Sequence, residues 1–260
     1  MSKKALMVVS FGTTYPEARR AIENLEERLC GAFPGYDFYR AFTSRMVADK
    51  IEREEGVHIP SPAELLEQLA ADGYEEVRCQ SLHVIFGQEY EKLMEQLRPF
   101  CGRFARLLAG APLLWDTQDY LRLTRALLGG MPRLAEDEAY VFMGHGTEHP
   151  ANAAYALVEN CFRYHGAERI YVGTVEGFPN FEYVLARLHR REVDRVHLAP
   201  LMIVAGDHAQ NDLAGEGEDS WKSRLQSEGY DVEIHLTGLG ELAAVGDIFT
   251  DHCRQAKPLA

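Results

Sequence analysis

The sequence has few cysteines, and no two of them have a metal-binding or redox spacing. The five stand at positions 30, 79, 101, 161 and 253, with no CxxC motif and an odd total. Neither a disulfide framework nor a thiolate zinc site is therefore supported. We expect these cysteines to act as small buried apolar side chains.

Basic residues are also in short supply. The chain carries 27 Lys and Arg against 40 Asp and Glu, which gives a formal net charge of −13 and a pI near 5.2. Nucleic-acid and anionic-membrane surfaces need clustered basic side chains, so neither partner is expected. The apolar run after Lys4 spans only about eight residues, too few for a signal-peptide core with a cleavage site or for a membrane span. We therefore expect a cytoplasmic protein.

Four sequence features of common enzyme classes are missing. The sequence has no G-x-x-x-x-G-K-[ST] loop and no G-x-G-x-x-G after a predicted strand, so nucleotide binding has little support. It also lacks the G-x-S-x-G nucleophile elbow of many hydrolases. A histidine phosphatase would have an arginine just before its strand-end histidine, where this chain has Gly144. No nucleotide or other organic cofactor is expected.

What the sequence does contain is an alternation of short apolar runs with helical patterns, typical of parallel α/β architecture. The predicted strands are 4–11, 36–41, 76–86, 104–110, 139–144, 168–175, 195–204 and 231–236. The predicted helices are 16–32, 44–54, 61–72, 88–98, 150–164, 179–191, 219–228 and about 240–256. Proline at 16, 150 and 179 is placed in the first turn of its helix.

The two halves begin alike, each with an apolar strand, a Gly-Thr step and a proline-started helix. This similarity predicts two lobes, each a roughly four-stranded parallel sheet flanked by helices, with the active-site cleft between them. The Gly/Pro-rich and acidic stretch 129–138 indicates the boundary. We expect lobes at 1–130 and 131–240, and a C-terminal helix within 241–260 whose apolar face can pack on the first lobe.

Three metal-ligand side chains follow second-half strands. His145, Glu176 and His208 each stand where an apolar run ends in a glycine-containing turn. Ligands of open α/β sheets bind beyond the carboxyl ends of the strands, so these side chains are expected to converge on a divalent metal. Asp207 is a candidate for orienting the His208 imidazole. The structural alternative for His208 and for Glu176 is that each caps a helix. Non-haem iron oxygenases also bind a metal through two histidines and a carboxylate, but they do so on β-barrels, which the alternating strand and helix pattern does not favour.

Further candidates lie in the first half. The turn 10–14 opens a helix, where backbone N–H groups and hydroxyls can hold an anion. His83 ends a predicted strand and can face the cleft beside Glu89, or it can be a satisfied structural histidine. His149 is expected to be peripheral. The remaining histidines have no motif around them and are predicted to be surface or structural residues: His58, His165, His189, His197, His235 and His252.

Several segments together resemble the anaerobic sirohydrochlorin cobaltochelatases, a family of the class II chelatase superfamily that is related to the ferrochelatases. The resemblance extends nearly end to end and is carried by 8–13, 40–44, 80–83, 142–146, 200–209, 219–222 and 238–241. It implies two α/β lobes with a cleft between them. It also implies that His145, Glu176 and His208 bind the incoming metal.

The activity implied by this resemblance is insertion of Co²⁺ into sirohydrochlorin, or precorrin-2, in anaerobic cobalamin biosynthesis, with His145 as the base. Donor-rich segments are expected to bind the ring carboxylates, and apolar side chains to pack on the macrocycle. The residues expected to bind the substrate are Ser10, Phe11, Gly12, Thr13, Ser44, Leu82, His83, Glu89 and Met202. Fe²⁺ or Ni²⁺ remains an alternative metal. A tetrapyrrole or metal carrier without turnover remains an alternative function, and the protein can be a homo-oligomer.

Overall fold

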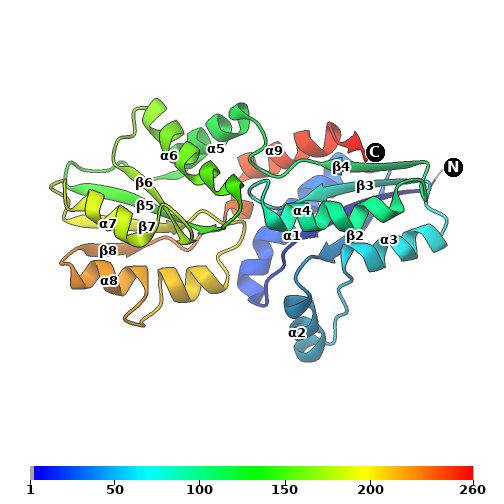
Figure 1. Cartoon of the computed structure of the whole chain (residues 1–260), viewed down its shortest axis with the longest axis horizontal. Helices are drawn as coiled ribbons and strands as arrows, with labels where there is room; N and C mark the ends of the chain where they lie inside the picture. The colour runs from blue at the N-terminus through cyan, green and yellow to red at the C-terminus, as the bar shows by residue number, and fades with distance from the viewer. Residues whose placement is uncertain (1–2, 260) are drawn as a thin grey trace. The chain divides into compact units, whose positions relative to one another are not determined.

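The computed structural model describes residues 3–259, which form two compact units. Unit 1 comprises the residues up to Trp115 together with those from Ala243 onward, and unit 2 is the continuous segment Asp116–Leu242. Each unit has a parallel sheet flanked by helices, which confirms the predicted fold class (Figure 1). The predicted boundary near residue 130 falls at the end of a helix that belongs entirely to unit 2.

Unit 1 has a five-stranded sheet in the order β2-β1-β3-β4-β9. Its first four strands are parallel, and β9 pairs antiparallel with β4. The strands are β1 Lys4–Ser10, β2 Asp37–Phe42, β3 Glu76–Ser81, β4 Arg106–Gly110 and β9 Lys257–Pro258. The helices are α1 Pro16–Ala32, α2 Arg45–Glu55, α3 Pro62–Ala71, α4 Gln88–Leu97 and α9 Ala243–Arg254.

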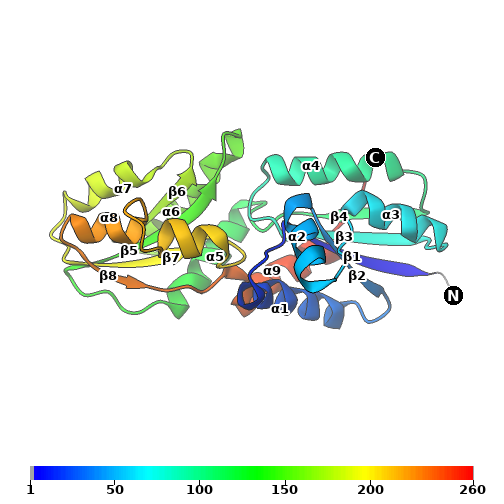
Figure 2. The same cartoon turned by 90° about the horizontal axis from the view of Figure 1, so that it is seen from below.

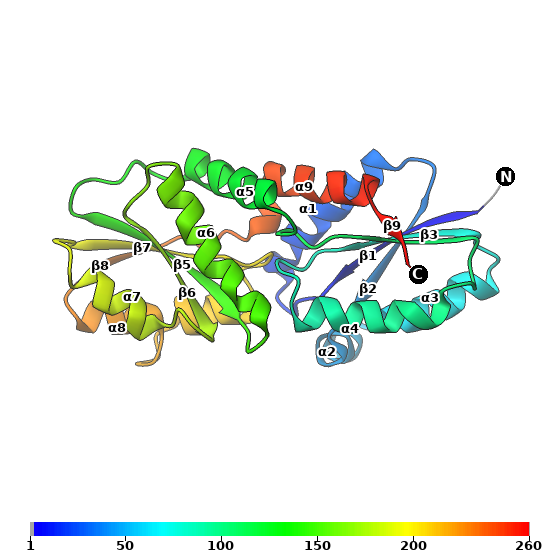
Figure 3. The same cartoon turned by 45° about the horizontal axis from the view of Figure 1, so that its top comes forward.

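Helices cover both faces of the unit 1 sheet, as Figures 2 and 3 show. On one face, alternate β1 side chains such as Met7 pack with apolar residues of α3 and α4, including Leu66 and Leu93. On the other face lie α1 and α9. The C-terminal helix thus belongs to unit 1, where Ile248 and Phe249 are fully buried.

Unit 2 has a four-stranded, all-parallel sheet in the order β6-β5-β7-β8. Its strands are β5 Glu138–Gly146, β6 Ile170–Glu176, β7 Arg195–Pro200 and β8 Asp231–Ile234. Its helices are α5 Thr117–Gly130, α6 Ala153–Tyr164, α7 Phe181–Leu188 and α8 Trp221–Ser227. Side chains such as Val141 and Met143 pack against α7 and α8, whereas Phe142 stacks on Phe162 of α6 on the opposite face.

Some elements differ from the sequence-based expectations. Helix α5 was not predicted, although Asp116 forms a capping box with Asp119 at its start. Strand β3 ends at Ser81, not 86, and β7 ends at Pro200, not 204. Helix α7 begins at Phe181 with Asn180 as its N-cap, so Pro179 lies before the helix and not in its first turn. The segment 150–164 divides into a 3₁₀ turn and α6. Among residues 3–259, no helix has the length and apolar character needed to cross a bilayer.

Candidate functional site

His145 is the next-to-last residue of β5, and the two glycines beside it are required by packing. A Cβ on Gly144 would lie 2.2 Å from the Tyr155 ring. Gly146 has a φ of +84°, and a Cβ there would lie 2.0 Å from the carbonyl oxygen of Glu176. Only a residue without a side chain fits either position, and His145 itself is exposed. The strand end therefore presents the imidazole without bulky neighbours in sequence.

The His145 imidazole has a defined tautomer. Its Nδ1 lies 2.9 Å from the carbonyl oxygen of Gly146, and because a carbonyl only accepts hydrogen bonds, Nδ1 must carry the proton. Nε2 is therefore the nitrogen through which the ring can bind a metal or accept a proton.

Glu176 ends β6, directly opposite Gly146 in the strand register. Its Oε2 lies 3.8 Å from His145 Nδ1, and its side chain is exposed. The next helix, α7, is capped instead by Asn180, whose side chain accepts a hydrogen bond from the Tyr183 N–H. Glu176 is thus directed to the neighbourhood of His145 and is not the N-cap of α7.

His208 lies beyond β7, just before a turn of π-helix at Ala209–Leu213. Its ring meets that of His145 edge to face, with the centroids 4.6 Å apart. Its Nδ1 lies 2.6 Å from Oδ2 of Asp212, one helical turn further on. The carboxylate that orients His208 is thus Asp212, while the expected partner, Asp207, accepts a hydrogen bond from the Asn211 amide. A carboxylate on Nδ1 fixes the ring and leaves Nε2 for a metal.

The structure brings His145, Glu176 and His208 together from three consecutive strands of unit 2. Their ligand atoms do not form a closed set, because they are not all within 4.8 Å of one another. Two imidazoles and a carboxylate suit a divalent transition metal. His145 and Glu176 are exposed and His208 is partly exposed, so this open arrangement favours an ion that enters and leaves, rather than a permanently enclosed one.

The predicted anion-binding turn in unit 1 is tightly built. Gly12 has a φ of +91°, and a Cβ there would clash with the Phe42 ring. Thr13 Oγ1 accepts a hydrogen bond from the Tyr15 N–H, while Phe11 is 46% exposed. Ser10 is buried, and its Oγ has no hydrogen-bond partner among the described residues. Of this turn, Phe11 offers a ligand the most surface.

The second group of predicted substrate residues in unit 1 ranges from buried to half-buried. His83 lies after β3, and its Nδ1 is 2.8 Å from Ser81 Oγ. Burial lowers the pKa of His83 to about 4, so the ring is neutral near pH 7. Glu89, in the first turn of α4, accepts hydrogen bonds from Thr43 and Lys92, and Leu82 is only 2% exposed.

Two other predicted residues have local roles. Ser44 caps α2 by accepting a hydrogen bond from the Val47 N–H. Met202 is partly buried against the core of unit 2. His149 accepts a hydrogen bond from the Ala151 N–H at the start of a 3₁₀ turn, in keeping with its predicted peripheral role.

One cluster was missed from the sequence. Across residues 3–259, the only group of three or more histidine, cysteine or carboxylate side chains with ligand atoms all within 4.8 Å is His197, Glu233 and His235. The only sequence signal is the alternation Glu233-x-His235, which places both side chains on one face of β8 and its extension. Pairing of that face with His197 required knowledge of the strand order.

Comparisons with known proteins agree along the whole chain. The model of the cobalt chelatase (CbiK) family matches residues 4–257. Sirohydrochlorin cobaltochelatase of Salmonella typhimurium is 43% identical over 99% of this chain and 98% of its own. Sirohydrochlorin cobaltochelatase CbiKC of Nitratidesulfovibrio vulgaris is 34% identical over 98% of this chain and 91% of its own.

Solved structures show the same fold at low sequence identity. SirB from Bacillus subtilis with Fe³⁺ superposes with a TM-score of 0.69 at 15% identity, covering 97% of this chain and 95% of that one. CbiX, described as the terminal enzyme for biosynthesis of siroheme in denitrifying bacteria, gives 0.54 at 18% identity, with 97% and 99% covered. Given the family match and two relatives above 30% identity over nearly its full length, the chain belongs to the cobalt chelatase (CbiK) family.

Proposed function

We propose that this protein inserts Co²⁺ into sirohydrochlorin. The observation that carries the proposal is the 43% identity, over nearly both full lengths, to a protein named for this reaction. The convergence of two imidazoles and a carboxylate at the strand ends of unit 2 supports it, because these ligands suit Co²⁺.

In this proposal the metal is a substrate, held by His145, Glu176 and His208. A chelatase must bind the ion firmly enough to replace part of its water shell, yet must release it to the ring nitrogens. Three protein ligands leave coordination positions open for that exchange, whereas a closed four-ligand site would retain the ion. Asp212 keeps the His208 ring oriented while the ion is transferred.

Metal insertion also removes two protons from the pyrrole nitrogens. We assign acceptance of both protons, one after the other, to His145 Nε2, since Nδ1 donates to the Gly146 carbonyl and Nε2 is released when the ion moves to the ring nitrogens. After each transfer the imidazolium can pass its proton to water, because the side chain is exposed. No redox step is involved, so the reaction needs no organic cofactor.

The expected substrate contacts in unit 1 and at Met202 stay predictions, as do a cytoplasmic location and the absence of a nucleic-acid partner. Among the unit 1 candidates, Phe11 and Glu89 are the most accessible for testing. Phe11→Ala should raise KM more than it lowers kcat if the exposed ring packs on the macrocycle.

The test is anaerobic absorption spectroscopy of sirohydrochlorin with substoichiometric protein and Co²⁺, Fe²⁺ or Ni²⁺ in separate samples. We expect multiple-turnover loss of the free-base spectrum, fastest with Co²⁺. His145→Ala should abolish insertion, whereas His189→Ala, which removes an exposed histidine paired with Glu228 in the same unit, should leave the rate unchanged.

Three outcomes would change the proposal. A spectral change that stops at one equivalent of protein would indicate a carrier. Faster turnover with Fe²⁺ or Ni²⁺ would reassign the metal. Near-normal turnover of the His145→Ala variant would remove this residue from the mechanism.

A further inference from the structure

The side chains of His197, Glu233 and His235 meet on one face of the unit 2 sheet. His197 is in β7 and pairs in register with Glu233 of β8, while His235 follows β8 directly. Tyr140 of β5 pairs with His197 on its other side. Side chains opposite one another in a parallel pair lie on the same face, and residues two apart in a strand share a face. The sheet therefore gathers all three groups at the β7–β8 edge.

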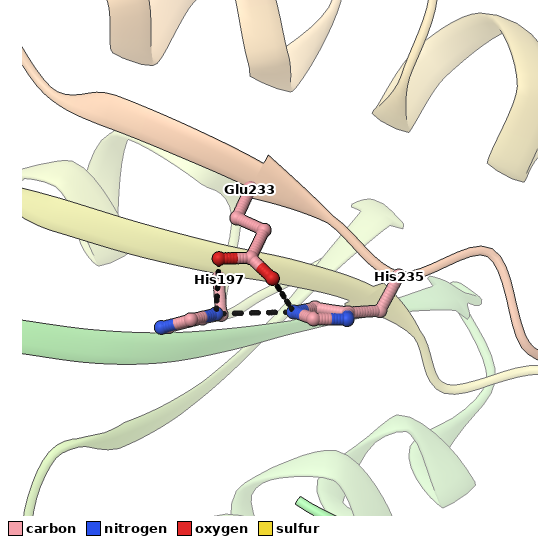
Figure 4. A group of neighbouring side chains, drawn as sticks. All are labelled: His197, Glu233 and His235. Carbon is pink, nitrogen blue, oxygen red and sulfur yellow. Dashed lines mark hydrogen bonds and ion pairs between the residues drawn. The ribbon is translucent and has the colours of Figure 1, made fainter. Parts of the chain in front are cut away.

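Figure 4 shows the three polar groups facing one another. His197 Nδ1 and His235 Nε2 are 3.0 Å apart. One oxygen of Glu233 lies 3.6 Å from His197 Nδ1, and the other lies 3.6 Å from His235 Nε2. The carboxylate thus spans the two imidazole nitrogens, with one oxygen directed at each.

These separations fit a common metal ion. Ligand atoms about 2.0–2.2 Å from an ion, at angles between 90° and the tetrahedral value, are roughly 2.9–3.5 Å from one another. The three measured separations, 3.0, 3.6 and 3.6 Å, lie at or near this range. The two imidazole nitrogens are hydrogen-bonded to each other, so an incoming ion would displace the proton between them, and small side-chain rotations would then complete the geometry.

The surroundings of His197 support a ligand role. The residue is only 3% exposed, and its Nε2 has no hydrogen-bond partner within the described chain. The nearest carboxylate to this nitrogen is that of Glu138, at 3.7 Å. If Nδ1 binds a metal, Nε2 must carry the proton, and Glu138 is then its acceptor. Metal-binding histidines commonly donate their second N–H to a carboxylate in this way.

The charges nearby also favour a cation. Arg195 is the basic side chain next to the cluster, 3.9 Å from both Glu138 and Glu233, and its shortest contact is 2.7 Å to Asp231. One guanidinium therefore faces three carboxylates. The two carboxylates at the cluster, those of Glu138 and Glu233, thus have one guanidinium between them, a negative excess that a divalent ion would compensate.

The imidazoles are held in place on their other side. The Tyr140 ring is nearly parallel to both, at interplanar angles of 8° to His197 and 16° to His235. The packing thus limits how far either ring can move when an ion binds.

We propose that His197, Glu233 and His235 form a second metal site, which binds a divalent first-row transition ion of the Zn²⁺, Co²⁺ or Ni²⁺ type. Imidazole and carboxylate ligands select this class over Mg²⁺ and Ca²⁺, which prefer oxygen. Glu233 and His235 are partly exposed, so water fills the remaining coordination positions and the ion exchanges with solvent.

This site is separate from the one proposed for metal insertion. His145 is five residues further along β5 than Tyr140, which lies beside the cluster, and at about 3.3 Å per residue this is roughly 16 Å along the strand. The two sites share no ligand. The inference therefore does not rest on the proposed function, and it can be tested in a protein that lacks the insertion ligands.

The experiment uses the His145→Ala/His208→Ala double variant of the full chain. This protein is dialysed against Zn²⁺ or Co²⁺ alone, and bound metal is measured per chain. We expect close to one equivalent to be retained, and Co²⁺ to give a visible absorption band. Adding His235→Ala should weaken binding at least tenfold, and adding Glu138→Gln should weaken it by about 10- to 100-fold through loss of the carboxylate next to His197.

Two controls make the result decisive. Adding His189→Ala to the double variant should leave binding unchanged, because this exposed histidine, paired with Glu228, is outside the cluster. Glu233→Gln keeps the shape of the side chain while removing its charge, and it should also weaken binding. It replaces the His235 variant as the test if circular dichroism shows that the His235 variant is poorly folded. Absence of bound metal in the double variant, or undiminished binding after both the His235 and Glu233 changes, would overturn the proposal.

Discussion

Replacing Gly146 by alanine tests how the strand end beside His145 is built. At this position φ is +84°, and the added Cβ would lie 2.0 Å from the carbonyl oxygen of Glu176. Gly166, in the same unit, provides a matched control: its φ is +81°, but no atom lies within 4 Å of its Cβ position. The two substitutions share the backbone strain and differ in the steric clash.

The expected losses follow from these two costs. A left-handed conformation costs an alanine about 1–2 kcal/mol, offset by about 0.4–1 kcal/mol from a less flexible unfolded chain. Gly166→Ala should therefore lower the free energy of unfolding by about 1 kcal/mol. At Gly146 the Glu176 backbone must also move by about 1 Å, because real Cβ contacts are essentially never shorter than 3.0 Å. Overpacking of this kind costs about 1–3 kcal/mol, for a total of about 2–4 kcal/mol.

Urea denaturation measures the difference. The chain has two tryptophans, of which Trp221 is buried in unit 2, so a Trp115→Phe background makes fluorescence report on this unit. Displacing Glu176 should also slow metal insertion by tenfold or more, whereas Gly166→Ala should leave the rate near normal. Equal stability losses for the two variants would refute the claim that contact with Glu176 requires glycine at 146.

Two further predictions concern single side chains. Asp212→Ala should weaken Co²⁺ binding at the insertion site by about 10- to 100-fold, because the carboxylate that orients His208 is lost. Binding is measured in a variant that lacks His235, and the more conservative Asp212→Asn should recover part of the affinity. Unchanged Co²⁺ binding in both Asp212 variants would contradict this role. Burial lowers the pKa of His83 to about 4, so as the pH falls this imidazole is protonated in the unfolded chain before it is protonated in the folded one. The contribution of His83 to the free energy of unfolding should therefore be fully present above about pH 6.5 and decline as the pH falls towards 4. Urea titrations at about pH 7 and about pH 5 should show a smaller decline for His83→Gln than for the unsubstituted protein.

Most of the fold could be predicted because the spacing of apolar residues and the positions of turn residues indicate the same strands and helices. All eight parallel strands are found, and helices such as α1 match their predicted bounds. Strand β3 was extended too far because Leu82 and its apolar neighbours continue the run. Its end is set by partners distant in sequence, because its pairing with β1 runs only to Ser81 and its pairing with β4 only to Gln80. Helix α5 had a local signal in Asp116 and in the spacing of Leu123 and Leu127, which an acidic and glycine-rich context obscured.

The two metal-ligand groups differ in what the sequence reveals. His145, Glu176 and His208 follow strands, so the rule that strand ends meet at one edge is enough to bring them together. The orienting role of Asp212 depends on the helical turn that begins at Asp207, which the sequence alone did not show. His197 is in mid-strand, where its partners depend on which strand lies beside β7. A side chain of this kind cannot be matched to its neighbours before the sheet order is known.

The division of unit 1 between the two ends of the chain affects how the protein is made. Helix α9 and strand β9 belong to this unit, although all of unit 2 is translated between them and Trp115. At about 5–20 residues per second, unit 1 must wait on the order of ten seconds for its last helix. During that interval the surface that later covers Val245 and Phe249 is without its partner, while unit 2 emerges as one uninterrupted segment. The unit synthesised second can therefore be the first to complete its fold, because unit 1 still lacks its last helix and strand when unit 2 is fully synthesised.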